Sequence, residues 1–131
     1  MSIPLEDNFE DVLGKALRGT GMADERLEFL SGVPVETIGM LKDGEPDEAA
    51  LRAVAPVLGL DAASLVERAR NAWAPQPVEV DGLRQFTTEY SDMLVNSYLV
   101  WDPSSKEAAL FDTGSDASEA LGAVDELGLT L

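Results

Sequence analysis

The sequence predicts an α+β protein in which a bundle of five short helices precedes three short strands and a final helix. Three observations support this fold class. Up to about residue 72, apolar residues recur at spacings of three and four, which is the period of an amphipathic helix. Residues 74–82, APQPVEVDG, contain two prolines and an Asp-Gly pair and are typical of a linker. From residue 83 the apolar runs become short, β-branched or aromatic, and bounded by turn residues, which indicates strands.

The helical domain is expected to span residues 1–73. Asp47 and Asp61 are N-cap candidates for the fourth and fifth helices, because a carboxylate can accept the free N–H groups of a first helical turn. Pro56 would remove a backbone hydrogen bond inside the fourth helix at a cost of about 3 kcal/mol. We therefore expect a kink there, or an end to the helix near Ala55. The core-facing residues are Phe9, Val12, Leu13, Ala16 and Leu17, then Leu27 and Leu30, then Val35, Ile38 and Leu41, then Leu51, Val54, Val57 and Leu58, and finally Leu65 and Val66.

Residues 83–131 are expected to form the three strands and the last helix. The turn sequence DPSSKE separates two apolar runs, which predicts a hairpin. The helix is predicted over residues 115–127, with Ser115 or Asp116 as its N-cap and Gly128 at its end. The sequence LTL then resumes an extended pattern. The predicted strands are Leu83–Thr88, Asn96–Asp102 and Glu107–Asp112.

The composition is that of a folded domain without a membrane anchor. The chain has 131 residues, of which 45% are hydrophobic, and no apolar run approaches the roughly 20 residues that cross a bilayer. Its N-terminus is acidic and lacks the features of a signal peptide. The absence of cysteine excludes a disulfide framework and a thiolate metal site. We therefore expect a soluble cytoplasmic protein that does not bind membranes.

Charge argues against polyanionic partners. The net charge is −16, from 25 acidic and 9 basic residues. Such a chain is repelled by nucleic acid and by anionic membrane surfaces unless its few cations gather on one face.

The N-terminal half resembles the Cro/repressor-like (XRE-type) helix-turn-helix family over residues 9–70. In that family a second helix, a tight turn and a third helix form the DNA-reading unit, and the resemblance implies that the third helix reads the major groove. Gly32 would relax the backbone at the turn. The positions that carry the resemblance are Leu27, Ser31-Gly32-Val33, Thr37-Ile38, Leu41 and Gly44.

The side chains that would contact DNA are few. The resemblance and the sparse cations point to Thr37, Lys42 and Arg26 as DNA-contacting residues. Residues 1–72 carry 14 acidic and 7 basic residues, a net charge of −7, which disfavours DNA. The alternative is a small bundle used for protein contacts, self-association or packing on the second half. DNA binding would require the cations Lys15, Arg18, Arg26, Lys42 and Arg52 to cluster despite their acidic surroundings.

The C-terminal half resembles the beginning of the metallo-β-lactamase superfamily, in particular its glyoxalase II-like hydrolases. The resemblance lies in MLVNSYLVWD, a short turn, KEAALFDTGSD and a helix that ends in ELGL. In that family, two adjacent strands lead to an Asp-x-Gly at a strand end, matched here by Asp112-Thr113-Gly114. A helix and another strand follow, and then a loop bearing His-x-His-x-Asp-His supplies most of the first metal site.

The resemblance implies a hydrolase of esters, thioesters, phosphoesters or lactams that uses zinc or a similar divalent metal to generate a hydroxide nucleophile. The chain contains neither His nor Cys, so we assign it no catalytic and no metal-binding residue and expect the fragment to be inactive. Asp112 and Gly114 would then be structural. Asp112 would brace the metal loop through hydrogen bonds. Asp-Thr-Gly is also a common strand-to-helix turn, so the alternative interpretation is a local turn and helix cap without a role beside a metal.

The sequence supports two interpretations of the whole chain. In the first, an acidic helix-turn-helix-like bundle precedes an incomplete βββα portion of the hydrolase, and the sequence is expected to continue beyond Leu131. In the second, the chain is a transcriptional regulator or an interaction module with a β dimerisation segment. We also expect self-association through the helical domain or an exposed sheet edge. The first reading leaves an apolar surface exposed, formed by Leu94, Val95, Leu99, Leu110 and Phe111.

Overall fold

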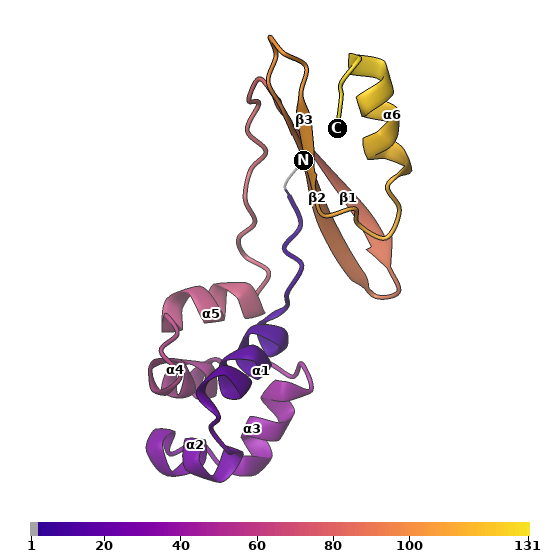
Figure 1. Ribbon diagram of the computed structural model, residues 1–131. Helices are drawn as coiled ribbons and strands as arrows, with labels where there is room; N and C mark the ends of the chain where they lie inside the picture. Colours follow the sequence, from indigo (N-terminus) through magenta and orange to yellow (C-terminus); the bar gives the residue numbers. More distant parts are fainter. Residues whose placement is uncertain (1–2) are drawn as a thin grey trace. The chain divides into compact units, whose positions relative to one another are not determined.

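Residues 3–131 are described by a computed structural model, in which they form two units (Figure 1). The first, the helical unit, spans Asp7–Trp73. The second, the sheet unit, joins residues 3–6 to Ala74–Leu131. The predicted α+β class is confirmed, since the described residues contain six α-helices and one three-stranded antiparallel sheet. The N-terminal residues, however, associate with the sheet unit rather than with the helices that follow them.

The helical unit has a single apolar core to which every one of its helices contributes. Leu13, Leu27, Ile38, Leu41 and Leu51 are completely buried, and each such side chain stabilises the fold by about 1.5–3 kcal/mol relative to an exposed position. Leu30, which we expected in the core, is instead exposed. The helices are α1 (Phe9–Thr20), α2 (Asp24–Ser31), α3 (Val35–Lys42), α4 (Glu48–Val57) and α5 (Ala62–Ala69).

The predicted N-caps of α4 and α5 are confirmed. The Asp47 carboxylate accepts the N–H of Ala50 at 2.9 Å, and the Asp61 carboxylate accepts the N–H of Ser64 at 2.8 Å. The expected end of α4 near Ala55 is two residues short, because the helix continues through Pro56 to Val57. Pro56 is the penultimate residue of the helix, so the hydrogen bond and the backbone geometry that it disrupts affect only the last turn.

The sheet consists of two consecutive hairpins. Strands β1 (Leu83–Tyr90), β2 (Met93–Trp101) and β3 (Ala108–Phe111) lie in the order β1-β2-β3. The predicted β2–β3 hairpin is confirmed, and the Asp102 carboxylate stabilises its turn by accepting the N–H of Ser104 at 2.6 Å. The first two strands also form a hairpin, with Ser91 in the left-handed region at φ 57°. Both strands are longer than the sequence predicted.

Helix α6 (Ser118–Leu127) covers one face of the sheet (Figure 1). Leu99 at the centre of β2 is completely buried in a cluster with Ala123 and Val124, and Leu110 packs against it. The expectation that Leu99 is exposed is therefore wrong. Side chains alternate between faces along a strand, so the exposed apolar residues are on the opposite face: Tyr98, Val100 and Phe111, at 37%, 40% and 59% exposure.

The chain returns to the sheet after α6. Thr130 forms a parallel bridge with Glu107, next to the start of β3. The N–H of Ala108 donates to the Thr130 carbonyl at 2.8 Å, and the N–H of Thr130 donates to the Lys106 carbonyl at 2.9 Å. Strand β3, α6 and this segment thus form a β-α-β crossover, which is the connection that parallel pairing requires.

Among the helices of residues 3–131, none has the length and apolar character that a membrane crossing would need.

Candidate functional site

The Asp-Thr-Gly sequence forms a tight turn directly after β3. Asp112 adopts a left-handed backbone conformation with φ 62°, and its Oδ1 accepts the N–H of Gly114 at 2.8 Å. This side chain-to-backbone hydrogen bond closes the turn locally. The other carboxylate oxygen, Oδ2, forms no hydrogen bond with any residue that the structure describes. Asp112 is exposed, so this oxygen is accessible to another group.

The turn is attached to the far strand of the sheet. Ser115 donates its N–H to Thr88 Oγ1 at 2.9 Å and its hydroxyl to the Glu89 carbonyl at 2.6 Å. Gly114 lies against the same threonine with φ 64°, and a Cβ at this position would overlap Thr88 Oγ1. Both backbone conformation and space therefore require glycine at this position. The turn is fixed to β1 across the end of the sheet.

The start of α6 differs from the prediction. The helix begins at Ser118, three residues later than expected, and Ala117 occupies the N-cap position. Asp116 accepts the hydroxyl of Ser118 at 2.6 Å and its N–H at 2.9 Å. These hydrogen bonds, chiefly the one from the hydroxyl, hold the pKa of Asp116 below its ordinary value. The predicted cap therefore orders the turn before the helix.

The groups of this turn are suited to hydrogen bonding with a neighbouring segment. Among residues 3–131, no three acidic side chains are gathered in a way that would hold a metal ion. The carboxylate of Asp112 offers one free acceptor oxygen in a rigid setting, which suits a hydrogen bond to a neighbouring segment. Asp112 and Gly114, the two structural residues predicted from sequence, are thus brought together in one turn. The anchor Thr88 was missed, and Ser115 was expected to cap the helix instead of binding β1, because nothing local in the sequence connects β1 to this turn.

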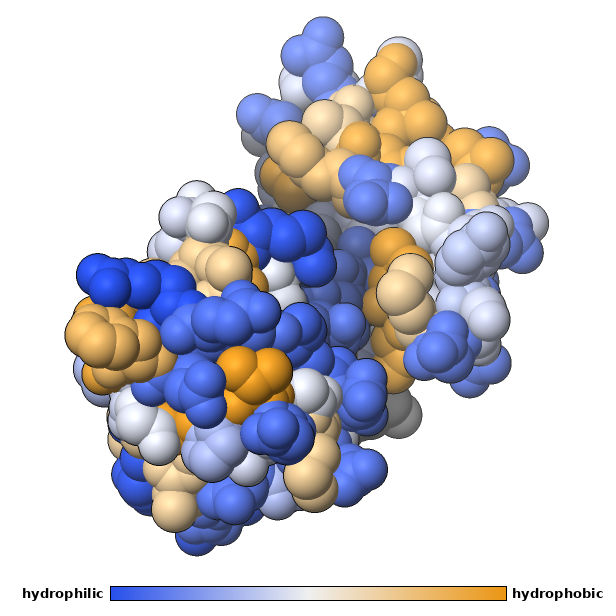
Figure 2. Space-filling model, turned by 90° about the horizontal axis from the view of Figure 1, so that it is seen from below, coloured by the Kyte–Doolittle hydropathy of each residue, from blue (hydrophilic) through white to orange (hydrophobic). Residues whose placement is uncertain are grey.

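The predicted DNA-contacting residues do not form one cationic surface. Lys42, at the end of α3, forms an ion pair with Asp24 at 2.7 Å. Arg26 lies over the ring of the exposed Phe29, 5.3 Å from its centre. Thr37 is half-buried in α3. Figure 2 shows a mostly hydrophilic surface on the helical unit, with apolar residues in separate patches.

Other cations of the helical unit are also held by neighbours. Lys15 pairs with Asp7 at 2.5 Å. Arg70 makes two hydrogen bonds to the Glu48 carboxylate, at 2.5 and 2.6 Å, and this interaction holds the pKa of Glu48 below its ordinary value. A phosphate would have to displace these carboxylates, so the electrostatic contribution to DNA affinity is reduced.

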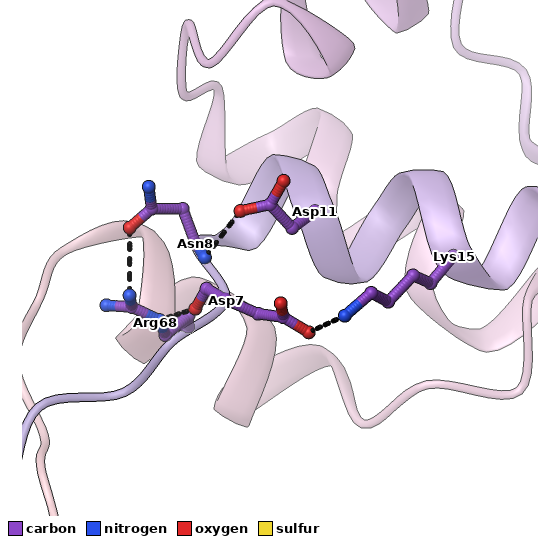
Figure 3. Close-up of polar contacts among 5 residues, drawn as sticks. All are labelled: Asp7, Asn8, Asp11, Lys15 and Arg68. Carbon is purple, nitrogen blue, oxygen red and sulfur yellow. Dashed lines mark hydrogen bonds and ion pairs between the residues drawn. The ribbon is translucent and has the colours of Figure 1, made fainter. Parts of the chain in front are cut away.

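Arg68 is a structural residue that sequence reasoning missed. Its Nε donates to the Asp7 carbonyl at 2.6 Å and its Nη2 donates to Asn8 Oδ1 at 2.9 Å (Figure 3). Its Nη1 donates to Asn71 Oδ1 at 2.5 Å. Arg68 therefore connects α5 to the start of α1, where the Asn8 N–H also donates to Asp11 at 2.9 Å. The spacing Asn8-x-x-Asp11 is a capping signal that could have located this helix start.

A cavity of about 230 Å³ lies beside Arg68. Each guanidinium nitrogen already donates to a neutral acceptor, and Glu10 brings a negative charge into the lining. The cavity thus offers no uncompensated charge to a small ligand. Its lining residues are Asn8, Phe9, Glu10, Gly44, Pro46, Arg68, Ala69 and Asn71.

Compared with known proteins, the chain matches no family model, no curated protein and no solved structure.

Proposed function

We propose that residues 83–131 form the opening part of a metallo-β-lactamase-type hydrolase fold and that the helical unit is an appended helix-turn-helix-like domain. The carrying observation is the path of the chain after β3. An Asp-x-Gly turn leads to α6, and Thr130 then pairs in parallel with Glu107 beside β3. The resemblance implies two adjacent strands, this turn, a helix and a further strand at the start of that fold, and the extended residue Thr130 lies where the further strand would begin.

The metal chemistry of such a hydrolase does not fit the residues of this chain. The family binds its metal ions mainly through imidazoles, and these 131 residues contain no histidine. None of these residues is therefore assigned to the metal or to a catalytic step. Asp112 is proposed to brace the metal loop of a complete enzyme through its free Oδ2.

The position of the exposed sheet face agrees with this proposal. A metallo-β-lactamase-type sheet is covered by helices on one face and by a second sheet on the other. Here α6 covers the face of Leu99, while Tyr98, Val100 and Phe111 leave the other face apolar and exposed. A complete fold would bury these three side chains.

Two measurements test the proposal. The 131-residue chain, incubated with Zn²⁺ and dialysed, is expected to retain no stoichiometric metal and to hydrolyse no ester, thioester, phosphoester or lactam probe. The coding sequence after Leu131 is expected to encode a His-x-His-x-Asp-His loop. A stop codon at that point, or stoichiometric zinc binding by the chain itself, would contradict the proposal.

A second candidate function is DNA binding by the helical unit. It is favoured by the turn between α2 and α3, where Gly32 has φ 75° and the following Val33 is buried. The test is a mobility shift of promoter DNA at low and high salt, with Lys42→Gln compared with Lys106→Gln in the sheet unit. A regulator would lose affinity with Lys42→Gln and with added salt. If the protein shifts the DNA at neither salt concentration, the helical unit is interpreted as a protein-contact domain.

A further inference from the structure

The N-terminal strap, residues 3–6, is bound to the middle strand of the sheet. Glu6 Oε1 accepts the backbone N–H of Asn96 at 2.6 Å, and the Pro4 carbonyl accepts the Asn96 side-chain amide at 2.8 Å. The Ile3 N–H donates to the Pro75 carbonyl at 2.8 Å. The strap is therefore attached through both backbone and side chain, ninety residues away from Asn96 in the sequence.

The strap covers an edge that β3 leaves open. Backbone N–H groups alternate between the two sides of a strand. The N–H of Asp102 points towards β3, where it donates to the Glu107 carbonyl at 3.0 Å. The N–H of Asn96, six residues earlier, points to the same side. Strand β3 ends at Phe111, opposite Tyr98, so no strand pairs with Asn96 on that side.

The edge of β2 that the strap covers belongs to a segment that is prone to pair with copies of itself. Residues 93–101, MLVNSYLVW, contain no charge, no proline and no glycine, and most are β-branched, aromatic or aliphatic. Segments of this kind pair readily with identical segments of other chains. Met93 is half-exposed at the open end of β2. A free edge here is a template for a second copy.

We propose that the N-terminal strap shields the β2 edge from pairing with the β2 strand of a second copy of this chain. The strap acts in two ways. It occupies the Asn96 N–H that a neighbouring strand would use, and it places the Glu6 carboxylate on the edge, where two approaching copies would bring like charges together. Residues 74–131 already carry 11 acidic and 2 basic residues, so the added carboxylate reinforces an existing repulsion.

The decisive variants are a deletion of residues 1–6 and the substitution Glu6→Ala in the full chain. The mass in solution is measured by light scattering over a concentration series, together with hydrogen exchange at the Asn96 amide. The parent chain is expected to protect this amide and to remain monomeric. Both variants should lose that protection, and the deletion should at least double the mean mass. Glu79→Ala, which removes a carboxylate without a hydrogen-bond partner among residues 3–131, should change neither.

A third variant separates edge pairing from general unfolding. Adding Leu94→Lys to the deletion places a charge on the exposed edge and should return the chain to a monomer. A deletion variant that keeps its β circular dichroism and stays monomeric would overturn the proposal. An oligomer that Leu94→Lys leaves unchanged would overturn it as well, because its association would then not use this edge.

Discussion

At the scale of single residues, Gly114 is the most restricted position of the turn after β3. Its φ of 64° is costly for any residue with a side chain, and Thr88 Oγ1 occupies the space of a Cβ. The same threonine accepts the N–H of Ser115 at 2.9 Å. Relief of the overlap would therefore break the hydrogen bond that attaches the turn to β1.

Gly114→Ala is expected to lower the free energy of unfolding of the sheet unit by about 2 kcal/mol, from left-handed strain together with the loss of one hydrogen bond. The matched control is Gly122→Ala in α6, where a Cβ meets no atom within 4 Å. That change should stabilise by about 0.5–1 kcal/mol, because alanine favours helix. Denaturant unfolding followed by β circular dichroism measures both. Equal effects of the two substitutions would contradict the turn geometry.

The carboxylate of Asp61 makes the stability of the helical unit depend on pH. The backbone N–H of Ser64 is the main cause that holds the pKa of Asp61 below its ordinary value of 3.8. The unfolded chain therefore binds a proton more readily than the folded one, and stability rises with pH through this window. The contribution of the ionised Asp61 carboxylate to stability is present above about pH 4 and is lost as the pH falls through the folded-state pKa.

Asp61→Ala should consequently lower the melting temperature at pH 7 and have a smaller effect at pH 3. Thermal unfolding of the helices at several pH values measures the difference. Glu67→Ala serves as the control, with a small effect at both pH values, because Glu67 is exposed in α5 and its carboxylate accepts no hydrogen bond within residues 3–131. A difference between Asp61→Ala and the parent that grows on acidification would contradict the assignment of this hydrogen bond.

At the scale of helices and strands, the sequence predicted elements that depend on local patterns. The stripes containing Leu13, Leu51 and Val66 identified their helices, because burial of one face imposes the helical period. The hairpin between β1 and β2 was missed, since its turn residues Ser91-Asp92 lack the glycine that usually marks such turns. The start of α6 was misplaced because Asp116, two residues before the first helical residue, closes a turn instead of capping the helix.

Arg68 shows how two helices are joined by contacts that no local pattern reveals. It bonds to the Asp7 carbonyl and to Asn8 Oδ1, sixty residues earlier in the sequence. Arg68→Ala is expected to destabilise the helical unit by about 1–3 kcal/mol, since the half-buried Asp7 carbonyl loses a charged donor and the exposed Asn8 side chain loses a hydrogen bond. Arg52→Ala is the control, because Arg52 is exposed and forms no ion pair within residues 3–131. Helical circular dichroism under denaturant measures both, and equal losses would show that Arg68 is not a connection.

At the scale of the whole molecule, the two units have cores of unequal size. The helical core contains fourteen buried apolar residues, whereas the cluster under α6 contains three, Leu99, Ala123 and Val124. Burial of apolar surface is the main source of stability, so the helical unit should be the more stable of the two. The sequence could predict two units from the change in periodicity. It could not predict that residues 3–6 belong to the second, because the Glu6–Asn96 contact depends on tertiary structure.

Hydrogen exchange should therefore separate the two units. The amides of β1, β2 and β3 are expected to exchange faster than those of α1 and α4, because regions with few buried contacts open at lower free energy. Leu51→Ala, which removes a completely buried side chain at a cost of about 2–5 kcal/mol, should accelerate exchange in the helices and leave β2 unchanged. Gly114→Ala should do the reverse. If either substitution accelerated exchange uniformly along the chain, the two units would unfold in one cooperative transition. The small core around Leu99 would then need stabilisation from outside the sheet unit.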